Sequence, residues 1–156
     1  RHTRYISVTG VQTCALPIFF DQALESSPEV MRQVRHLHAR FAACDAVVAC
    51  VPEYNGQLTP FFKNLIDWVS RVHYLDADAE NPFLARPVLL CSAATGWSGG
   101  QGAIQQARLL FAYLGAMAMG EGICVPGADE AWTGDIFSFA PAFERHVEAQ
   151  IGRAHV

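Results

Sequence analysis

The sequence predicts a doubly wound α/β fold, a parallel sheet with helices on both faces, and three observations support this. Short apolar runs at residues 46–51 and 87–93 are typical of parallel strands buried on both faces. Segments with apolar residues at helical spacing alternate with these runs, an order that favours parallel pairing. The chain has 156 residues, 51% of them hydrophobic and 17% charged, enough for one domain but too few for two.

The first expected helix begins at residues 26–28, where a serine hydroxyl can cap free N–H groups and Pro28 suits the first turn. Its apolar stripe is Val30, Val34, Leu37 and Phe41. We expect this helix to end near Cys44 and the strand at residues 46–51 to follow it. Residues 52–57 then break the pattern.

A second helix is expected to begin at Thr59 and Pro60, and it carries two neighbouring apolar stripes. One stripe is Phe62, Leu65, Ile66 and Val69, and the other is Phe61, Trp68 and Val72. A helix this apolar is covered on more than one side. One stripe can pack on the sheet and the other on a second subunit, so we expect a homo-oligomer through residues 59–72.

The remaining elements follow in the same alternation. A polar connection at residues 76–82 leads to the strand at 87–93 and then to a glycine-rich loop at 95–102. A third amphipathic helix carries Ile104, Ala107, Phe111 and Leu114, with Gly115 as its stop. We expect a short strand at residues 122–126 and a last helix that begins near Pro141.

The two ends of the chain stand apart from the rest. Residues 1–18 and 151–156 resemble in-frame translations of sequencing-library adapters, and we expect the domain itself to span residues 19–150. Three of the 11 basic residues lie in these ends, which leaves eight against 15 acidic residues and a net charge near −7. An acidic domain without a Lys/Arg cluster is a poor binder of nucleic acid or anionic membranes.

The five cysteines show neither a Cys-x-x-Cys pair nor a His spacing that builds a zinc site, so we expect no metal centre. Cys50, Cys91 and Cys124 lie inside apolar runs, which favours reduced, buried thiols in a cytoplasmic protein. No apolar run is long enough to cross a bilayer.

The strongest motif is V-P-E-Y-N-G at residues 51–56, followed by P-F-F-K-N-L-I-D-W at residues 60–68. It resembles the signature of the NADPH-dependent FMN reductase family, in which a strand, PEYNG, a proline and a KN-x-x-DW helix follow in this order. Phe62 stands where the family more often has leucine. The resemblance extends from about Phe19 to Gln150. It implies a flavodoxin-like fold in a family that includes flavin, quinone, azo-dye and chromate reductases.

This resemblance implies that FMN binds beside the PEYNG loop, with Pro52, Glu53, Tyr54, Asn55 and Gly56 at the isoalloxazine. In open parallel sheets, ligands bind beyond the carboxyl ends of strands where strand order reverses. Tyr54 offers an aromatic surface, Asn55 offers hydrogen bonds, and Gly56 permits close backbone approach. The Asn-Gly pair by itself is more typical of an ordinary turn, but the whole stretch favours the flavin.

A second loop follows the strand at 87–93 and reaches the same sheet edge. Its candidate cofactor contacts are Ser92, Gly96, Gly99 and Gly100. In the family, the equivalent loop approaches the flavin ring. The loop contains neither a P-loop nor a Gly-x-Gly-x-x-Gly fingerprint. A flexible loop that caps the next helix explains each of these residues as well as direct contact does.

No acid–base or nucleophilic constellation stands out, so no catalytic side chain is predicted. This does not exclude an enzyme, because a flavin carries the hydride chemistry while the protein binds and orients it. The resemblance implies NAD(P)H as the hydride donor and a flavin, a quinone or a similar small molecule as the acceptor. Two alternatives stay open: a flavodoxin-type FMN electron carrier, and a cofactor-free interaction domain of the same fold.

In the family, the first strand leads into a Ser/Gly/Arg-rich loop that holds the FMN phosphate at a helix N-terminus, a place that favours anions. No such loop precedes Phe19. We therefore expect the first strand, the phosphate loop, the first helix and the second strand to be missing. The strand at 46–51 would then have an unpaired apolar edge. Residues 5–8 alternate weakly and are a candidate substitute, although nothing selects them for that place. We expect the chain as written to bind FMN poorly and to be inactive.

Overall fold

A parallel sheet forms the centre of the computed structural model, which describes residues 5–7, 18–130, 132–133, 136–137, 145 and 147–149. The strand order is β1-β2-β5-β6, and β7 pairs with the same edge of β5 as β6 does. The strands are β1 (Tyr5–Ser7), β2 (Ala46–Cys50), β5 (Pro87–Ala93), β6 (Met117–Ala118) and β7 (Ile123–Val125). Every pair in this sheet is parallel, which confirms the predicted α/β class.

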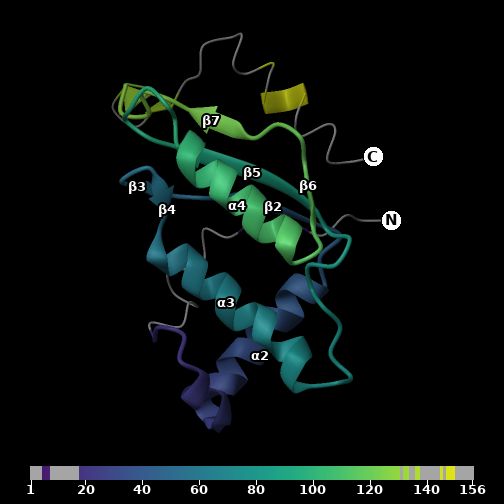
Figure 1. Cartoon of the computed structure of the whole chain (residues 1–156). Helices are drawn as coiled ribbons and strands as arrows, with labels where there is room; N and C mark the ends of the chain where they lie inside the picture. Colours follow the sequence, from purple (N-terminus) through teal and green to yellow (C-terminus); the bar gives the residue numbers. More distant parts are fainter. Residues whose placement is uncertain are drawn as a thin grey trace.

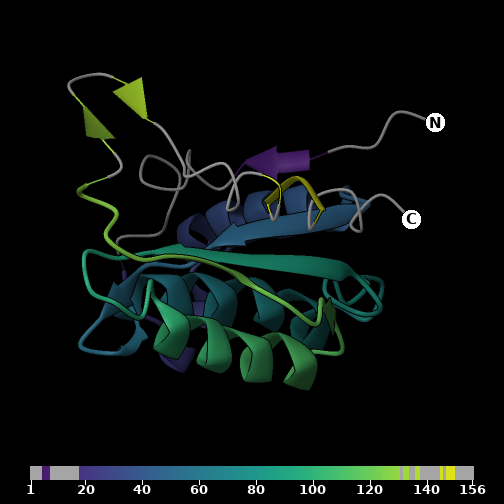
Figure 2. The same cartoon turned by 90° about the horizontal axis from the view of Figure 1, so that it is seen from above.

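Helices connect the successive strands. They are α2 (Pro28–Ala42), α3 (Pro60–Leu75) and α4 (Gln101–Tyr113), preceded by the short 3-10 helix η2 (Gln22–Ser26). The Thr59 hydroxyl caps α3 by accepting a hydrogen bond from the Phe62 N–H at 3.4 Å, as the Thr-Pro start signal predicts. Helices α3 and α4 lie side by side on one face of the sheet (Figures 1 and 2). None of the described helices is long and apolar enough to span a bilayer.

The main core fills the space between the sheet and these two helices. Alternate residues of β2 and β5 enter it together with the inner faces of α3 and α4. Phe111 of α4 lies at its centre, completely buried, with its ring 6.3 Å from that of Phe62 and 5.8 Å from that of Phe83. These edge-on aromatic contacts connect α3, α4 and the connection that precedes β5.

The second apolar stripe of α3 packs inside the same chain. Trp68 and Val72 form a separate buried cluster with Val30, Met31 and Val34 of α2. The stripe that we expected to meet another subunit is therefore covered by α2, except for Phe61, which stays 43% exposed. The homo-oligomer stays a prediction, and Trp68 and Val72 no longer support it.

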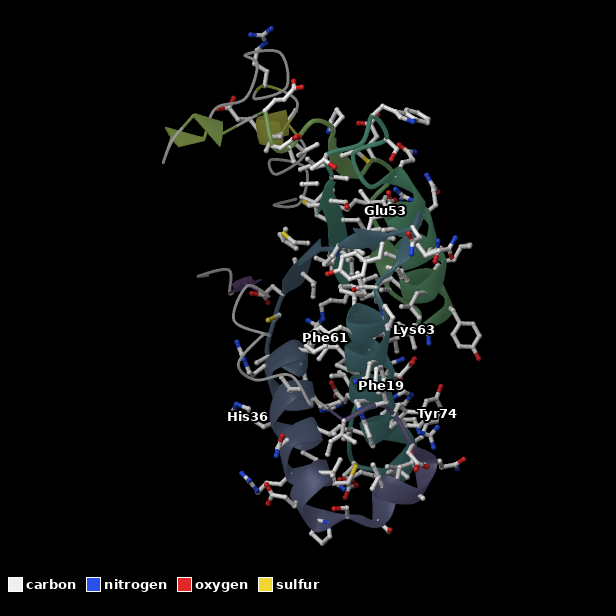
Figure 3. All side chains as sticks on the ribbon, turned by 90° about the vertical axis from the view of Figure 1, so that its left-hand side faces the viewer. Phe19, His36, Glu53, Phe61, Lys63 and Tyr74 are labelled. Carbon is white, nitrogen blue, oxygen red and sulfur yellow. The ribbon has the colours of Figure 1, made fainter. Side chains whose placement is uncertain are left out.

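Two polar residues of the KN-x-x-DW segment hold the chain just before η2 against α3. Asn64 donates a hydrogen bond to the Ile18 carbonyl at 3.1 Å and accepts one from the Phe20 N–H at 2.6 Å. The Trp68 indole N–H donates to the same Ile18 carbonyl at 3.0 Å, and its ring meets Phe20 edge-on at 4.9 Å. Figure 3 shows Phe19 beside this helix. In this structure, the Asn64 and Trp68 side chains hold residues 18–20 against α3.

Strand β2 does not have the unpaired edge that the sequence led us to expect. The backbone of β1 pairs with it in parallel, with Tyr5, Ile6 and Ser7 opposite Ala46, Val47 and Val48. A ladder of backbone N–H and C=O groups needs no particular side chains, which is why a weakly patterned segment can form it.

Three further expectations need correction. The break at residues 52–57 contains two short strands, β3 (Glu53–Tyr54) and β4 (Gln57–Leu58), which pair antiparallel. The strand expected at residues 122–126 is limited to β7, and β6 precedes it. Cys50, expected to be buried, is exposed, because it ends β2 on the face away from α3 and α4.

The far end of the chain is described only in part. Strands β8 (Trp132–Thr133) and β9 (Ile136–Phe137) form a second small antiparallel pair. Residues 145 and 147–149 are helical, and the rest of the helix expected near Pro141 lies outside the described residues.

We predict that Phe111→Ala lowers the free energy of unfolding by about 3–5 kcal/mol, because it leaves a cavity between two other aromatic rings. The matched control is Leu109→Ala on the same helix, where the leucine is 73% exposed. It should change stability by no more than about 0.5 kcal/mol. Urea unfolding followed by circular dichroism measures both values, and equal losses would contradict the described core.

Candidate functional site

The loops after β2 and β5 begin side by side at one edge of the sheet. Cys50 and Cys91 are register partners near the ends of the two strands. One residue later, the Val51 N–H donates to the Cys91 carbonyl at 2.7 Å, and the Ser92 hydroxyl donates to the Val51 carbonyl at 2.6 Å. The two predicted loops therefore meet, as expected for the carboxyl ends of neighbouring parallel strands.

The first loop is a β-hairpin with a two-residue turn. Tyr54 pairs with Gln57, which leaves Asn55 and Gly56 as the turn. Their φ angles are 52° and 72°, the left-handed values of a type I′ turn, for which Asn-Gly is the favoured sequence. Asn55 and Gly56 are exposed, and so is the Tyr54 side chain, with 67% of its surface accessible.

The hairpin is clamped onto the first turns of α4. The Glu53 carboxylate accepts a hydrogen bond from the Ala103 N–H at 3.0 Å. Figure 3 shows Glu53 near the upper end of α4. Gln106 accepts from the Leu58 N–H and donates to the Gly56 carbonyl, both at 3.2 Å. A carboxylate suits this position because the first N–H groups of a helix lack partners and its dipole is positive there.

This clamp divides the five predicted residues of the first loop. The Glu53 side chain is directed to α4, so it holds the hairpin in place. Pro52, Tyr54, Asn55 and Gly56 are exposed and open to a ligand.

The second loop is also divided into packed and open positions. A Cβ on Gly99 would lie 2.7 Å from the Pro126 nitrogen, and a Cβ on Gly100 would collide with the Ser92 hydroxyl. These two glycines, with φ angles of 59° and 87°, let the loop seat against β7 and β5. By contrast, a Cβ on Gly96 would have no heavy atom within 4 Å, and the neighbouring Trp97 is 94% exposed.

Sequence reasoning missed two residues of this edge, Gly102 and Gln106, and it named Trp97 only as part of the second loop. A Cβ on Gly102 would run into the Gly56 carbonyl oxygen, so only glycine lets the hairpin approach α4 this closely. The sequence placed Gly102 at the end of the glycine-rich loop, whereas α4 already begins at Gln101. This misplacement hid its role as a close-approach position within the helix. The hydrogen bonds of Gln106 cannot be predicted from local sequence, since its partners Leu58 and Gly56 lie 48 and 50 residues away.

The arrangement suits a flat ring with a polar edge. It offers an exposed aromatic ring at Tyr54, an exposed amide at Asn55 and open backbone at Gly96. Among the described residues, no three His, Cys, Asp or Glu side chains gather in a way that could hold a metal ion.

Comparison with known proteins adds sequence relatives. The family described as NADPH-dependent FMN reductase matches residues 3–130. A quinone reductase of Escherichia coli K12 is 28% identical over 119 residues, 73% of this chain and 60% of that protein. An NAD(P)H-dependent FMN reductase of Pseudomonas aeruginosa is 33% identical over 66 residues, 42% of this chain and 32% of that protein. The chain thus spans about three fifths of the length of the curated quinone reductases it matches.

Solved structures share the fold. The flavoenzyme NAD(P)H:(acceptor) oxidoreductase FerB from Paracoccus denitrificans aligns with a TM-score of 0.66 at 24% identity, over 90% of this chain and 71% of that one. An oxidoreductase from Corynebacterium diphtheriae aligns with a TM-score of 0.50 at 19% identity, over 82% of this chain and 58% of that one. The predicted flavodoxin-like fold is confirmed.

We predict that Gly102→Ala destabilises the protein although alanine favours helices. Helix propensity alone would stabilise the variant by about 1 kcal/mol, but the collision with the Gly56 carbonyl should reverse the sign and cost about 1–3 kcal/mol. The matched control is Gly120→Ala, because a Cβ there would have no heavy atom within 4 Å. Urea unfolding measures both, and a more stable Gly102→Ala variant would show that the hairpin does not press on α4.

Proposed function

The chain belongs to the NADPH-dependent FMN reductase family, and from this we propose that it is part of an NAD(P)H-dependent reductase that passes electrons through bound FMN to a flavin, a quinone or a similar small acceptor. Two relatives are themselves called a quinone reductase and an FMN reductase. The observation that carries the proposal is the exposed Tyr54–Asn55–Gly56 turn, clamped at the edge where the second loop also begins.

The residues at this edge fit the ring part of FMN. Tyr54 would contact the ring with its aromatic surface, Asn55 would hydrogen-bond its polar edge, and Gly96 would allow close approach. When bound, FMN supplies the hydride chemistry. The proposed contacts are those of the two loops: Pro52, Glu53, Tyr54, Asn55, Gly56, Ser92, Gly96, Gly99 and Gly100.

Four of these residues would act through backbone position. The Glu53 carboxylate and the Ser92 hydroxyl have partners inside the protein, and Gly99 and Gly100 pack against neighbouring strands. Their part would be to hold the loop backbones rigid at the ring, since a preorganised site loses less free energy on binding. We propose no acid–base role for any side chain at this edge.

The phosphate of FMN needs a different place. A helix N-terminus suits it, but the Glu53 carboxylate already lies at the N-terminus of α4. Residues 8–17, which follow β1, lie outside the described residues. We propose that the chain as written binds FMN weakly and has little activity, while the parent protein is a cytoplasmic homo-oligomer.

We also propose that residues 1–18 and 151–156 are foreign to the reductase, as their resemblance to adapters suggests. The family match begins at residue 3 and β1 pairs with β2, and both observations favour residues 1–18 as part of the domain. The DNA sequence of the source locus therefore provides the test. An independent reading of the source locus upstream of the Phe19 codon should continue into a strand and a Ser/Gly-rich loop. A locus that encodes residues 1–18 unchanged would refute this.

We predict that Tyr54→Ala weakens FMN binding by up to about tenfold, the equivalent of the roughly 0.5–1.5 kcal/mol of an aromatic contact. Quenching of FMN fluorescence during titration with the protein that carries its complete N-terminal region measures it. Tyr113→Ala is the control, because Tyr113 is also exposed but is the last residue of α4, at the opposite end of the helix from the hairpin. Equal effects of the two substitutions would remove Tyr54 from the site.

Activity separates the reductase from the two alternatives. The protein with its complete N-terminal region should bind FMN and oxidise NAD(P)H in the presence of a quinone. An electron carrier would bind FMN but oxidise no NAD(P)H alone, and a cofactor-free domain would bind no FMN.

A further inference from the structure

Two cysteines face each other across the central pair of strands. Cys50 of β2 and Cys91 of β5 are register partners, and both are free thiols. Neighbouring strands lie about 4.8 Å apart, and register partners project to the same face of a sheet. Disulfides join Cα atoms that are about 4.4–6.8 Å apart. The strand spacing at this register pair therefore falls within the Cα–Cα range of disulfides.

The pair lies on the face of the sheet away from α3 and α4. Val47, Ala49 and Val51 enter the core on the helix side, so Cys50 projects to the other side, where it is exposed. Cys91 is partly exposed. Cys44, in contrast, is a buried cysteine whose thiol donates to the Arg40 carbonyl at 3.2 Å.

The two thiols differ in acidity. A hydrogen bond from the Cys91 thiol lowers the pKa of Cys50 to about 6, which favours the thiolate form of Cys50 over that of an ordinary cysteine. The pKa of Cys91 is raised, first because its proton is held in that bond and then because of burial. This is the asymmetry of a pair in which one thiol attacks and the other follows.

We propose that Cys50 and Cys91 are a redox-active thiol pair, which small-molecule disulfides such as oxidised glutathione convert to an intrachain cross-strand disulfide. The Cys50 thiolate attacks one sulfur of glutathione disulfide, and the first glutathione leaves as a thiolate that takes up a proton. Cys91 then loses its proton and attacks the Cys50 sulfur, which releases the second glutathione. Two protein thiols are oxidised, and one small disulfide is reduced to two thiols.

The bond would form directly below the candidate site. Cys50 precedes Val51 and Cys91 precedes Ser92, and these two following residues already share a hydrogen bond of 2.6 Å. The thiol pair needs no FMN, so it stands or falls separately from the proposed function.

The test is made on the wild-type chain. The reduced protein is incubated with oxidised glutathione at neutral pH, quenched with acid and alkylated, and its disulfides are mapped by peptide fragmentation, which also distinguishes Cys50 from Cys44. We expect a Cys50–Cys91 disulfide that retains no glutathione and that dithiothreitol reverses. The proposal is overturned if both thiols stay reduced, if Cys50 keeps a glutathione, or if it joins another cysteine.

Three variants sharpen the result. Cys91→Ser should accumulate a stable glutathione adduct on Cys50, because the second thiol is missing. Cys50→Ser should leave Cys91 largely unmodified over the same time. Cys124→Ser is the matched control on the next strand and should form the Cys50–Cys91 disulfide as the wild type does. Loss of the disulfide in Cys124→Ser would contradict the assignment.

Discussion

The contact between the β3–β4 hairpin and the first turns of α4 is the constraint on which the candidate site depends. Helix α4 grows directly out of the second loop, so whatever fixes the start of α4 fixes that loop as well. The Glu53 carboxylate satisfies an N–H that the helix itself cannot, and Gly102 has no side chain to collide with the Gly56 carbonyl. A cap of this kind contributes about 0.5–2 kcal/mol. These contacts thereby fix the position of the first loop relative to the second.

The fold could be predicted where burial leaves a local pattern. Strands β2 and β5 are continuous apolar runs, as is typical of parallel strands in the centre of a sheet, and their ends agree with the sequence within one residue. Helices α2 and α3 begin at Pro28 and Pro60, as the prolines predict. Thr59 makes the expected side-chain cap of α3, whereas the serine cap expected for α2 is absent, because the Ser27 side chain makes no cap hydrogen bond. Strands β1, β6 and β7 have two or three residues each. Their pairing depends on backbone groups offered by the edges of β2 and β5, which no side-chain period records.

The site was predictable in place but not in detail. Topology alone brings the loops after β2 and β5 to one edge, and the Asn-Gly pair is the favoured sequence of a two-residue hairpin turn. The contacts of Glu53 and Ser92 depend on Ala103 and Val51, which are 50 and 41 residues distant. Spacing within a motif carries no information about such partners. The Glu53 and Ser92 side chains, which the motif suggested as ligand contacts, form hydrogen bonds inside the protein instead.

The cysteine pair and the hairpin clamp constrain the same edge from two sides of the sheet. Ser92 already bridges β2 to β5 one residue beyond the cysteines, so a bond between Cys50 and Cys91 would join positions that are already aligned. It would close a loop of about 40 residues that contains all of α3, and such a loop restricts the unfolded chain by about 4 kcal/mol. Oxidation would therefore stabilise the β2–α3–β5 unit while leaving the loops where they are. The redox state of this cysteine pair would therefore change the stability of the candidate site more than its geometry.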